Sequence, residues 1–205
     1  MSTSMKNSKE SSKDPLHTHD HALSQLQYIR STMDGVTRFT AVPGAGTAVI
    51  GMTALLAAVL AQMQSTRDEM LLVWVGEAVI AGCVGLAAMV VKSRRTGVDL
   101  ARGAARKFVL ALMPSALCAA AVSLALAMHE QTLLIPGVWL TGYGSAVIAA
   151  GAHSVPTIPI MGAGFVAAGL AALFVAPEHQ NALLALAFGG LHIAFGVHIA
   201  RHHGG

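Results

Sequence analysis

Charged residues are scarce in this 205-residue chain, and their scarcity excludes an ordinary soluble domain. Asp, Glu, Lys and Arg together make up only 11% of the sequence, whereas hydrophobic residues make up 54%. A soluble globular domain carries about 25% charged residues. The mean hydropathy of +0.61 agrees with this comparison. The composition therefore predicts that most of the chain lies in a membrane.

Cysteine is almost absent, which removes disulfides and thiolate metal sites from consideration. The two cysteines, Cys83 and Cys118, fall near the middle of two different apolar stretches. A thiol in such a place usually behaves as a small buried hydrophobe. Because neither a Cys-x-x-Cys pair nor a Cys/His metal spacing occurs, the sequence predicts no redox or structural role for them.

The motifs of soluble catalysis are also missing. The sequence contains no Walker loop, dinucleotide-binding glycine fingerprint, Gly-x-Ser-x-Gly elbow or His-Glu-x-x-His helix. We therefore favour a non-enzymatic protein, although an enzyme stays an open alternative. The Ser- and Lys-rich N-terminus also lacks the apolar core of a cleavable signal peptide. The first apolar stretch is expected to act as its own insertion signal.

Six apolar stretches are present, each about as long as a membrane span. A bilayer core about 30 Å thick requires roughly 20 apolar residues in helical conformation. The sequence therefore predicts an all-α, polytopic transmembrane bundle of six helices. The stretches cover residues 40–63, 70–91, 107–127, 132–152, 155–176 and 181–200. The predicted organisation is a flexible polar cytoplasmic tail (1–20), an amphipathic interfacial helix (21–38), a transmembrane domain (39–201) and a short cytoplasmic tail (202–205).

The segment 21–38 has helical apolar periodicity. Leu23, Leu26, Ile29 and Met33 recur at intervals of three and four, with polar residues between them. Such a helix lies in the headgroup plane of a bilayer or provides a docking face for a soluble partner. We favour the first reading, an interfacial entry helix; the second places a possible protein partner at the cytoplasmic face.

Basic residues are distributed unevenly among the predicted loops. Because Lys and Arg in short loops are retained in the cytoplasm, this distribution places both termini there. It also agrees with a multi-pass membrane protein. The loop between the second and third stretches can contact anionic headgroups or a partner, and we expect no nucleic-acid binding. The basic residues of this loop region are Lys92, Arg94, Arg95, Arg102, Arg106 and Lys107.

Glycine is abundant in the apolar stretches, with 21 glycines in the chain. Helices in lipid rely on small residues for close approach, so a tightly packed bundle is expected, and self-association into a homo-oligomer is open. The spacing of glycine and alanine residues in the first stretch recurs in the fifth. This repeat indicates either a duplicated helical hairpin or, as we favour, shared small-residue packing. The candidate packing positions are Gly44, Gly51, Gly162, Gly169, Gly189 and Gly196.

Two ionisable residues, Glu77 and His192, lie within apolar stretches. Such residues are costly in a membrane and face the bundle interior. Glu77 is expected to act as structural polar glue, or alternatively to remain protonated, bind a cation or transfer protons. His192 lies between Gly189 and Gly196, which favours an interhelical hydrogen bond; axial ligation of a b-type haem is the alternative. No cofactor is predicted as the leading interpretation.

Potential metal ligands gather on the opposite face from the basic loop. His129 and Glu130 follow the third stretch, while Glu178 and His179 precede the sixth. Imidazole and carboxylate groups on neighbouring loops can hold a divalent metal if the fold brings them together. Charged loop ends are common, so a solvated role is favoured.

Three sequence segments resemble uncharacterised bacterial six-helix membrane proteins. They are Phe39-Thr-Ala-Val-Pro-Gly, Phe188-Gly-Gly-Leu-His-Ile-Ala-Phe-Gly and Ile199-Ala-Arg-His-His-Gly-Gly. The resemblance implies an architecture and a bacterial membrane address, and it carries no established activity or catalytic residue.

The expected function is a non-enzymatic membrane module: a sensor, an assembly partner or a complex subunit. A small proton- or cation-coupled transporter using Glu77 and His192 is the first alternative, and a b-type cytochrome is the second.

Overall fold

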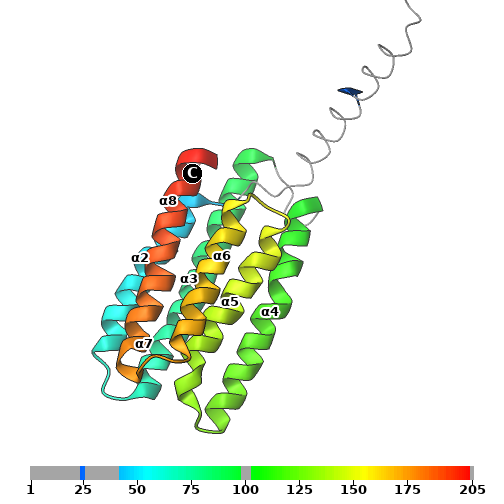
Figure 1. Ribbon diagram of the computed structural model, residues 1–205. Helices are drawn as coiled ribbons and strands as arrows, with labels where there is room; N and C mark the ends of the chain where they lie inside the picture. The colour runs from blue at the N-terminus through cyan, green and yellow to red at the C-terminus, as the bar shows by residue number, and fades with distance from the viewer. Residues whose placement is uncertain (1–23, 26–41, 98–102, 204–205) are drawn as a thin grey trace, which may run out of the picture. The chain divides into compact units, whose positions relative to one another are not determined.

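A computed structural model describes residues 24–25, 42–97 and 103–203. The chain divides into two units, Met1–Arg38 and Phe39–Gly205. The amphipathic helix predicted over 21–38 lies outside the described residues apart from 24–25, which are helical. The second unit is all-helical in its described part (Figure 1).

Helices account for nearly every described residue of the second unit. Five helical segments are long and apolar enough to cross a membrane, and a shorter apolar helix, α6, lies between the last two of them. These are the features of a multi-pass membrane protein. The helices are α2 (Gly44–Gln62), α3 (Arg67–Thr96), α4 (Gly103–Met128), η1 (Thr132–Leu134), α5 (Ile135–Gly151), α6 (Thr157–Ala172), α7 (Pro177–Leu184), η2 (Ala185–Leu191) and α8 (His192–His203).

The sequence fixes the ends of α3 by local capping. The Thr66 side chain accepts a hydrogen bond from the Glu69 backbone N–H, and the Glu69 carboxylate accepts one from the Thr66 N–H. This capping box satisfies two N–H groups that the helix leaves unpaired. The helix ends at Gly97, whose φ of 69° is left-handed and favours glycine.

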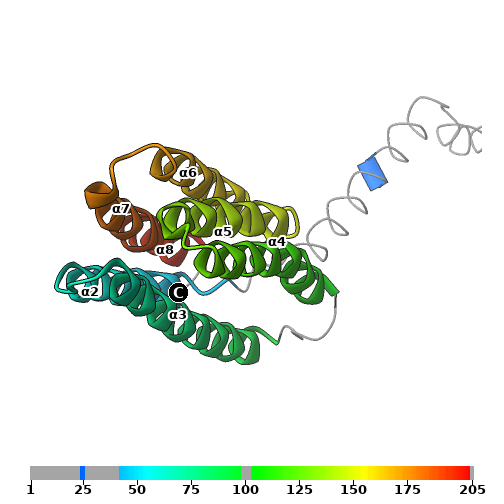
Figure 2. The same ribbon diagram turned by 90° about the horizontal axis from the view of Figure 1, so that it is seen from below.

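The helices form two layers of three. The first layer contains α3, α2 and the continuous run α7–η2–α8, while the second contains α4, α5 and α6 (Figure 2). The most extensive contacts are those of α5 with α6, α4 with α5, α2 with α8, and α2 with α3. Along α2, successive glycines contact progressively earlier residues of α8 and η2, so α2 and α8 are antiparallel. The glycine contacts between α5 and α6 follow the same order, so these two helices are also antiparallel.

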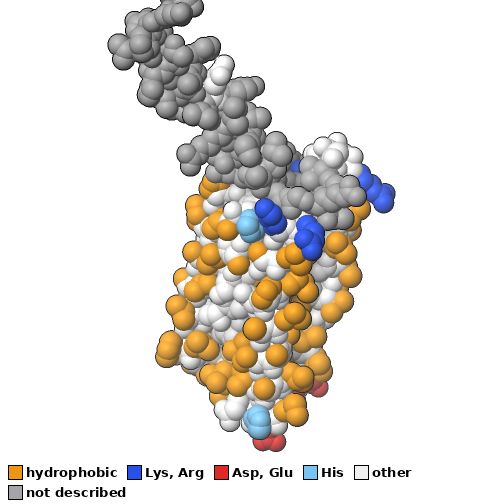
Figure 3. All heavy atoms as spheres, turned by 90° about the vertical axis from the view of Figure 1, so that its right-hand side faces the viewer, with side chains coloured by type: hydrophobic (Ala, Val, Ile, Leu, Met, Phe, Trp, Pro, Cys, Tyr) orange, Lys and Arg blue, Asp and Glu red, His pale blue; other side chains and the backbone are white. Residues whose placement is uncertain are grey.

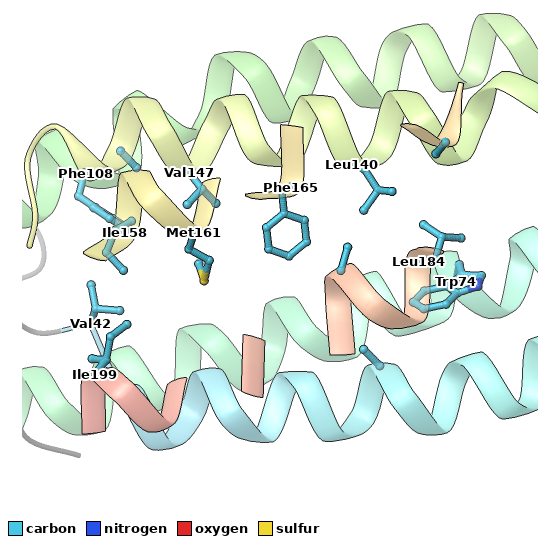
Figure 4. Close-up of a cluster of buried hydrophobic side chains, with 14 of the residues drawn as sticks. Val42, Trp74, Phe108, Leu140, Val147, Ile158, Met161, Phe165, Leu184 and Ile199 are labelled. Atoms are coloured by element: carbon cyan, nitrogen blue, oxygen red, sulfur yellow. The ribbon is translucent and has the colours of Figure 1, made fainter. Parts of the chain in front are cut away.

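Large side chains fill the space between the two layers. Phe165 and Leu140 are fully buried there, and Met161 is nearly so. Figure 4 shows these side chains reaching from the second layer toward Ile199 and Trp74 of the first layer. The core thus lies between the layers, where bulky residues keep the backbones apart.

Charges separate to the two ends of the bundle. We call the end where α3 begins the Arg67 end, and the end where α3 finishes the Lys92 end. A broad apolar surface lies between them, with Lys and Arg near one end and Asp and Glu at the other (Figure 3). Exposed apolar side chains on α3 and α4 include Leu72, Val79, Leu86, Leu110, Leu117 and Leu124. This surface is suited to contact with lipid tails.

Candidate functional site

His192 lies at the centre of an aromatic cluster that joins the two layers. The residue is only 3% exposed and stands at the junction of η2 and α8. Tyr143 of α5, Phe165 of α6 and Phe188 of η2 all have ring centroids within 6.2 Å of the imidazole. Trp74 of α3 extends the cluster, with its ring 6.0 Å from that of Phe188. Rings from α5, α6 and η2 therefore surround the imidazole at the start of α8, and α3 contributes Trp74 at the edge of the cluster.

Both ring nitrogens of His192 make hydrogen bonds. Nδ1 lies 2.8 Å from the carbonyl oxygen of Phe188, and Nε2 lies 2.8 Å from the hydroxyl of Tyr143. A carbonyl oxygen only accepts, so Nδ1 carries a proton. In the neutral imidazole Nε2 is then an acceptor, and the Tyr143 O–H donates to it. The arrangement fixes the tautomer and leaves neither nitrogen free to bind iron.

The segment that carries His192 has an unusual helical geometry. Residues Ala185–Leu191 form a π-helix, in which each N–H bonds to a carbonyl five residues back. The bond from His192 to Phe188 gives a carbonyl of this segment a side-chain donor. Gly189 and Gly190 lie within it. The sequence Phe-Gly-Gly-Leu-His thus places a wide helical turn directly before the buried imidazole.

Glu77 lies in a separate polar contact between α3 and α2. Its side chain is 6% exposed, and Oε1 accepts a hydrogen bond of 2.8 Å from the Thr53 hydroxyl. The same hydroxyl lies 2.9 Å from the carbonyl oxygen of Ile50. Among the described residues, no Lys, Arg or His forms an ion pair with Glu77. Thr53 is consequently the polar partner that defines this position.

The structure does not join Glu77 to His192 by a hydrogen bond. Trp74 lies three residues before Glu77 on α3 and contacts Phe188, whose carbonyl binds His192. The described contacts therefore connect α3, which carries Glu77, to His192 through an indole and a phenyl ring. The transporter alternative that uses both residues stays a prediction.

A second polar network at the Arg67 end was missed by the sequence reasoning. Asn181 accepts a 2.9 Å hydrogen bond from the Trp74 indole and donates to the Ala58 carbonyl and to Gln62, each at 3.0 Å. This one amide connects α7 with both α3 and α2. The available signal was a pair of amide residues, Gln180 and Asn181, at the start of an apolar stretch.

The neighbouring residue, Gln180, makes hydrogen bonds toward the second layer. Its side-chain nitrogen donates to the carbonyls of Leu133 and Ala172, at 3.0 and 3.1 Å. Its oxygen accepts from the guanidinium of Arg67, which also reaches the Thr132 carbonyl at 3.3 Å. The Nε atom of Arg67 is a buried nitrogen without a hydrogen-bond partner in the described structure. The network ties the short connections of the Arg67 end together.

The candidate packing glycines occupy positions of close helix approach. A Cβ built on Gly51 would lie 2.7 Å from the Gly189 carbonyl oxygen, and one on Gly162 would lie 2.8 Å from that of Gly144. Gly44 of α2 likewise faces Gly196 and Ala200, whereas Gly169 of α6 faces Thr141. The glycines that recur in α2 and α6 therefore meet different partners, α8 and α5. That glycine packing drives association in a bilayer stays a prediction.

The proposed outer-face metal ligands are all exposed at the Arg67 end. They are His129, Glu130, Glu178 and His179. In the described parts of the chain, no three His, Cys, Asp or Glu side chains are arranged to hold a metal ion. Glu130 has a left-handed φ of 58° where α4 ends, and the next N–H, that of Gln131, bonds to the Leu126 carbonyl. Its described role is therefore local, in terminating a helix.

The basic residues of the Lys92 end do not form a uniform surface. Lys92 is only 8% exposed, and its ammonium donates a 2.9 Å hydrogen bond to the Val42 carbonyl just before α2. Its ammonium is directed at the protein itself, and its contact with headgroups or a partner stays a prediction. Arg102 lies outside the described residues. Of the basic residues predicted for headgroup or partner contact, Arg94, Arg95, Arg106 and Lys107 are exposed.

Both cysteines, Cys83 and Cys118, are free thiols on exposed positions of different helices. Comparison with known proteins gave no match to a family model, a curated protein or a solved structure.

Proposed function

We propose that this protein is a non-enzymatic integral membrane module that acts as an assembly partner or complex subunit in a bacterial cytoplasmic membrane. The observation that carries the proposal is the complete hydrogen bonding of His192 by Tyr143 and Phe188. Buried polar residues that bond to other helices specify packing, whereas a reactive site needs a group with a vacant position. The amides of Gln180 and Asn181 follow the same pattern.

The proposed module spans the membrane six times. Helix α6 has 16 residues and is about 24 Å long at 1.5 Å per residue, which is shorter than a typical bilayer core. It nevertheless runs antiparallel to α5, from the contact of Gly151 with Pro159 to that of Gly137 with Leu173. Because α5 crosses in this scheme, a helix paired along its whole length crosses with it. Six crossings put both termini on one side.

The orientation proposed for this bundle places the Lys92 end in the cytoplasm. Exposed Arg94, Arg95, Arg106 and Lys107 lie at this end, while Asp68 and Glu69 lie at the other. Retention of basic residues in the cytoplasm supports this assignment. The same four cations are suited to anionic lipid headgroups or to an acidic surface of a partner protein.

Glycine-mediated packing is part of the proposal. Gly51 and Gly189 approach each other between α2 and η2, and Gly144 and Gly162 do so between α5 and α6. Where lipid tails compete equally for apolar side chains, close backbone approach supplies dispersion contacts that lipid does not. A Cβ built on exposed Gly82 of α3 would meet no atom of another described element within 4 Å, which leaves a small surface for self-association.

A proton- or cation-coupled transporter is the second candidate. The buried Glu77, which has Thr53 as its hydrogen-bond partner, favours it. Its test is transport in proteoliposomes with Glu77→Gln, which should abolish activity that depends on a titrating carboxylate. Unchanged transport by this variant would remove the candidate.

The proposed module is tested by an optical spectrum and elemental analysis of protein purified gently from its native membrane. We expect no haem absorption and no stoichiometric metal, together with a stable complex that contains a specific second protein. A reducible Soret band that disappears in His192→Ala would overturn the proposal and establish a cytochrome. Tyr143→Phe is the control, because freeing Nε2 should strengthen such a band if iron competes for that nitrogen.

A further inference from the structure

The contact between Thr53 and Glu77 has a property that a purely structural polar pair does not need. The Thr53 hydroxyl has one proton, yet two acceptors lie within hydrogen-bond distance of its oxygen. These are Oε1 of Glu77 at 2.8 Å and the carbonyl oxygen of Ile50 at 2.9 Å. A hydroxyl donates one hydrogen bond and accepts up to two. The direction of the bonds therefore depends on the protonation state of Glu77.

Two complete hydrogen-bond patterns fit the same positions of the heavy atoms. With Glu77 ionised, Thr53 donates to the carboxylate. With Glu77 protonated, its O–H donates to the Thr53 oxygen, and Thr53 donates to the Ile50 carbonyl. Neither pattern leaves the Thr53 hydroxyl or the Oε1 position without a partner, so the change requires no helix movement. We propose that Glu77, Thr53 and the Ile50 carbonyl form a reversible proton-binding site between α2 and α3.

The charges around the site favour a proton as its ligand. Helix α2 contains no titratable side chain along its whole length. On the α7–η2–α8 run, His192 is the titratable group linked to Trp74 through Phe188, and it is bonded to Tyr143 of α5. On α3 itself, Arg67 and Lys92 lie ten and fifteen residues from Glu77, so no described cation neutralises it. A carboxylate at this depth is neutralised by binding a proton taken from water, which it returns on ionising.

This inference is independent of the assembly role proposed above, because a proton site can exist in a complex subunit or in a carrier. The site lies between two helices that are adjacent in the chain, and 6% of the Glu77 surface is exposed.

Infrared difference spectroscopy of the full-length protein in lipid vesicles tests the site directly. A protonated carboxylic acid in an apolar setting gives a C=O stretching band that a carboxylate lacks. We expect a band equivalent to a single carboxyl per chain, lost reversibly as pH is raised and absent in Glu77→Gln. Glu77→Asp should retain a titrating band at a different frequency. This variant assigns the band to residue 77 if Glu77→Gln does not fold.

The hydroxyl partner is tested with matched threonine variants on one helix. Thr53→Val should shift the band frequency, because the acid then loses its acceptor, while Thr53→Ser should preserve it. Thr47→Val is the control, since the Thr47 hydroxyl donates to the carbonyl of Pro43, four residues earlier in the chain, at 2.9 Å. A band that persists unchanged at every pH, a band that never forms on acidification, or one unaffected by Thr53→Val overturns the proposal.

Discussion

The Tyr143 hydroxyl lies 2.8 Å from Nε2 of His192 and connects α5 in one layer with the η2–α8 junction in the other. The two residues are 49 positions apart in the chain. Their rings also pack together, with centroids 5.5 Å apart. This pair is thus both a polar and an apolar contact between the layers.

Removing the hydroxyl of Tyr143 isolates the polar part of this contact. Tyr143→Phe retains the ring and its packing against Phe165 and Phe188, but leaves Nε2 of His192 without a donor. Hydrogen bonds between membrane helices contribute about 0.6 kcal/mol on average, with values to about 1.7. We expect a loss within this range, measured by denaturant unfolding in mixed micelles. A double-mutant cycle with His192→Ala that shows no coupling would contradict the assigned bond.

Asn181 should be more important for stability than its short side chain suggests. Asn181→Ala removes the acceptor of the Trp74 indole and the donor to the Ala58 carbonyl. Leaving such a buried polar group unpaired costs about 1–3 kcal/mol. Unfolding in mixed micelles should show this loss for Asn181→Ala. Trp74→Phe, which keeps an aromatic ring without the N–H, should couple to Asn181→Ala; additive effects would argue against the bond.

Glycine positions differ in how much space surrounds them, which gives a matched pair of substitutions. Gly51→Ala places a methyl group 2.7 Å from the Gly189 carbonyl oxygen, so the backbones of α2 and η2 must separate. Overpacking of this kind costs about 1–3 kcal/mol. Gly82→Ala meets nothing within 4 Å and should be neutral or slightly stabilising. If the two variants changed the free energy of unfolding equally, the predicted close packing of glycines between α2 and η2 would be wrong.

The crossing of α6 is tested by single cysteines on either side of it. Ala152 and Ala176 are exposed in the connections that precede and follow this helix. In a chain whose Cys83 and Cys118 are replaced by alanine, Ala176→Cys should react with an impermeant maleimide in intact cells. Ala152→Cys should react only after the cytoplasmic face is opened. Labelling of both from one side would mean that α6 does not cross and that the bundle has five spans.

Much of the fold follows from residues that are close together in the sequence. Apolar stretches near 44–62 and 67–96 predict their helices, and Thr66, Glu69 and Gly97 mark where α3 begins and ends. The segregation of basic residues to the loop after α3 likewise needs no tertiary information. Periodicity is less informative for α2, α5 and α6, because apolar residues surround these helices on every side.

The candidate sites show the limit of that information. Glu77 and His192 are recognisable as rare ionisable residues in apolar stretches, but their partners Thr53 and Tyr143 are not. Thr53 is one of several threonines in the apolar stretches. Tyr143 is one of only two tyrosines in the chain, but its sequence neighbourhood does not indicate which helix it meets. For Lys92 the sequence predicted contact with headgroups or a partner, and its hydrogen bond to the Val42 carbonyl could not be predicted from its position in the chain.

The sequence by itself determined the helical membrane class, the positions of most helices and the charge difference between the two ends. Those properties depend on transfer of side chains to lipid and on local backbone bonds. Only the tertiary structure decided that Gly51 faces Gly189 whereas Gly162 faces Gly144, and that Tyr143 bonds to His192. The physical reason is that lipid tails are as apolar as the helix surfaces. The hydrophobic pattern therefore does not distinguish a helix face that meets another helix from one that meets lipid, and close packing and scarce polar contacts make that choice.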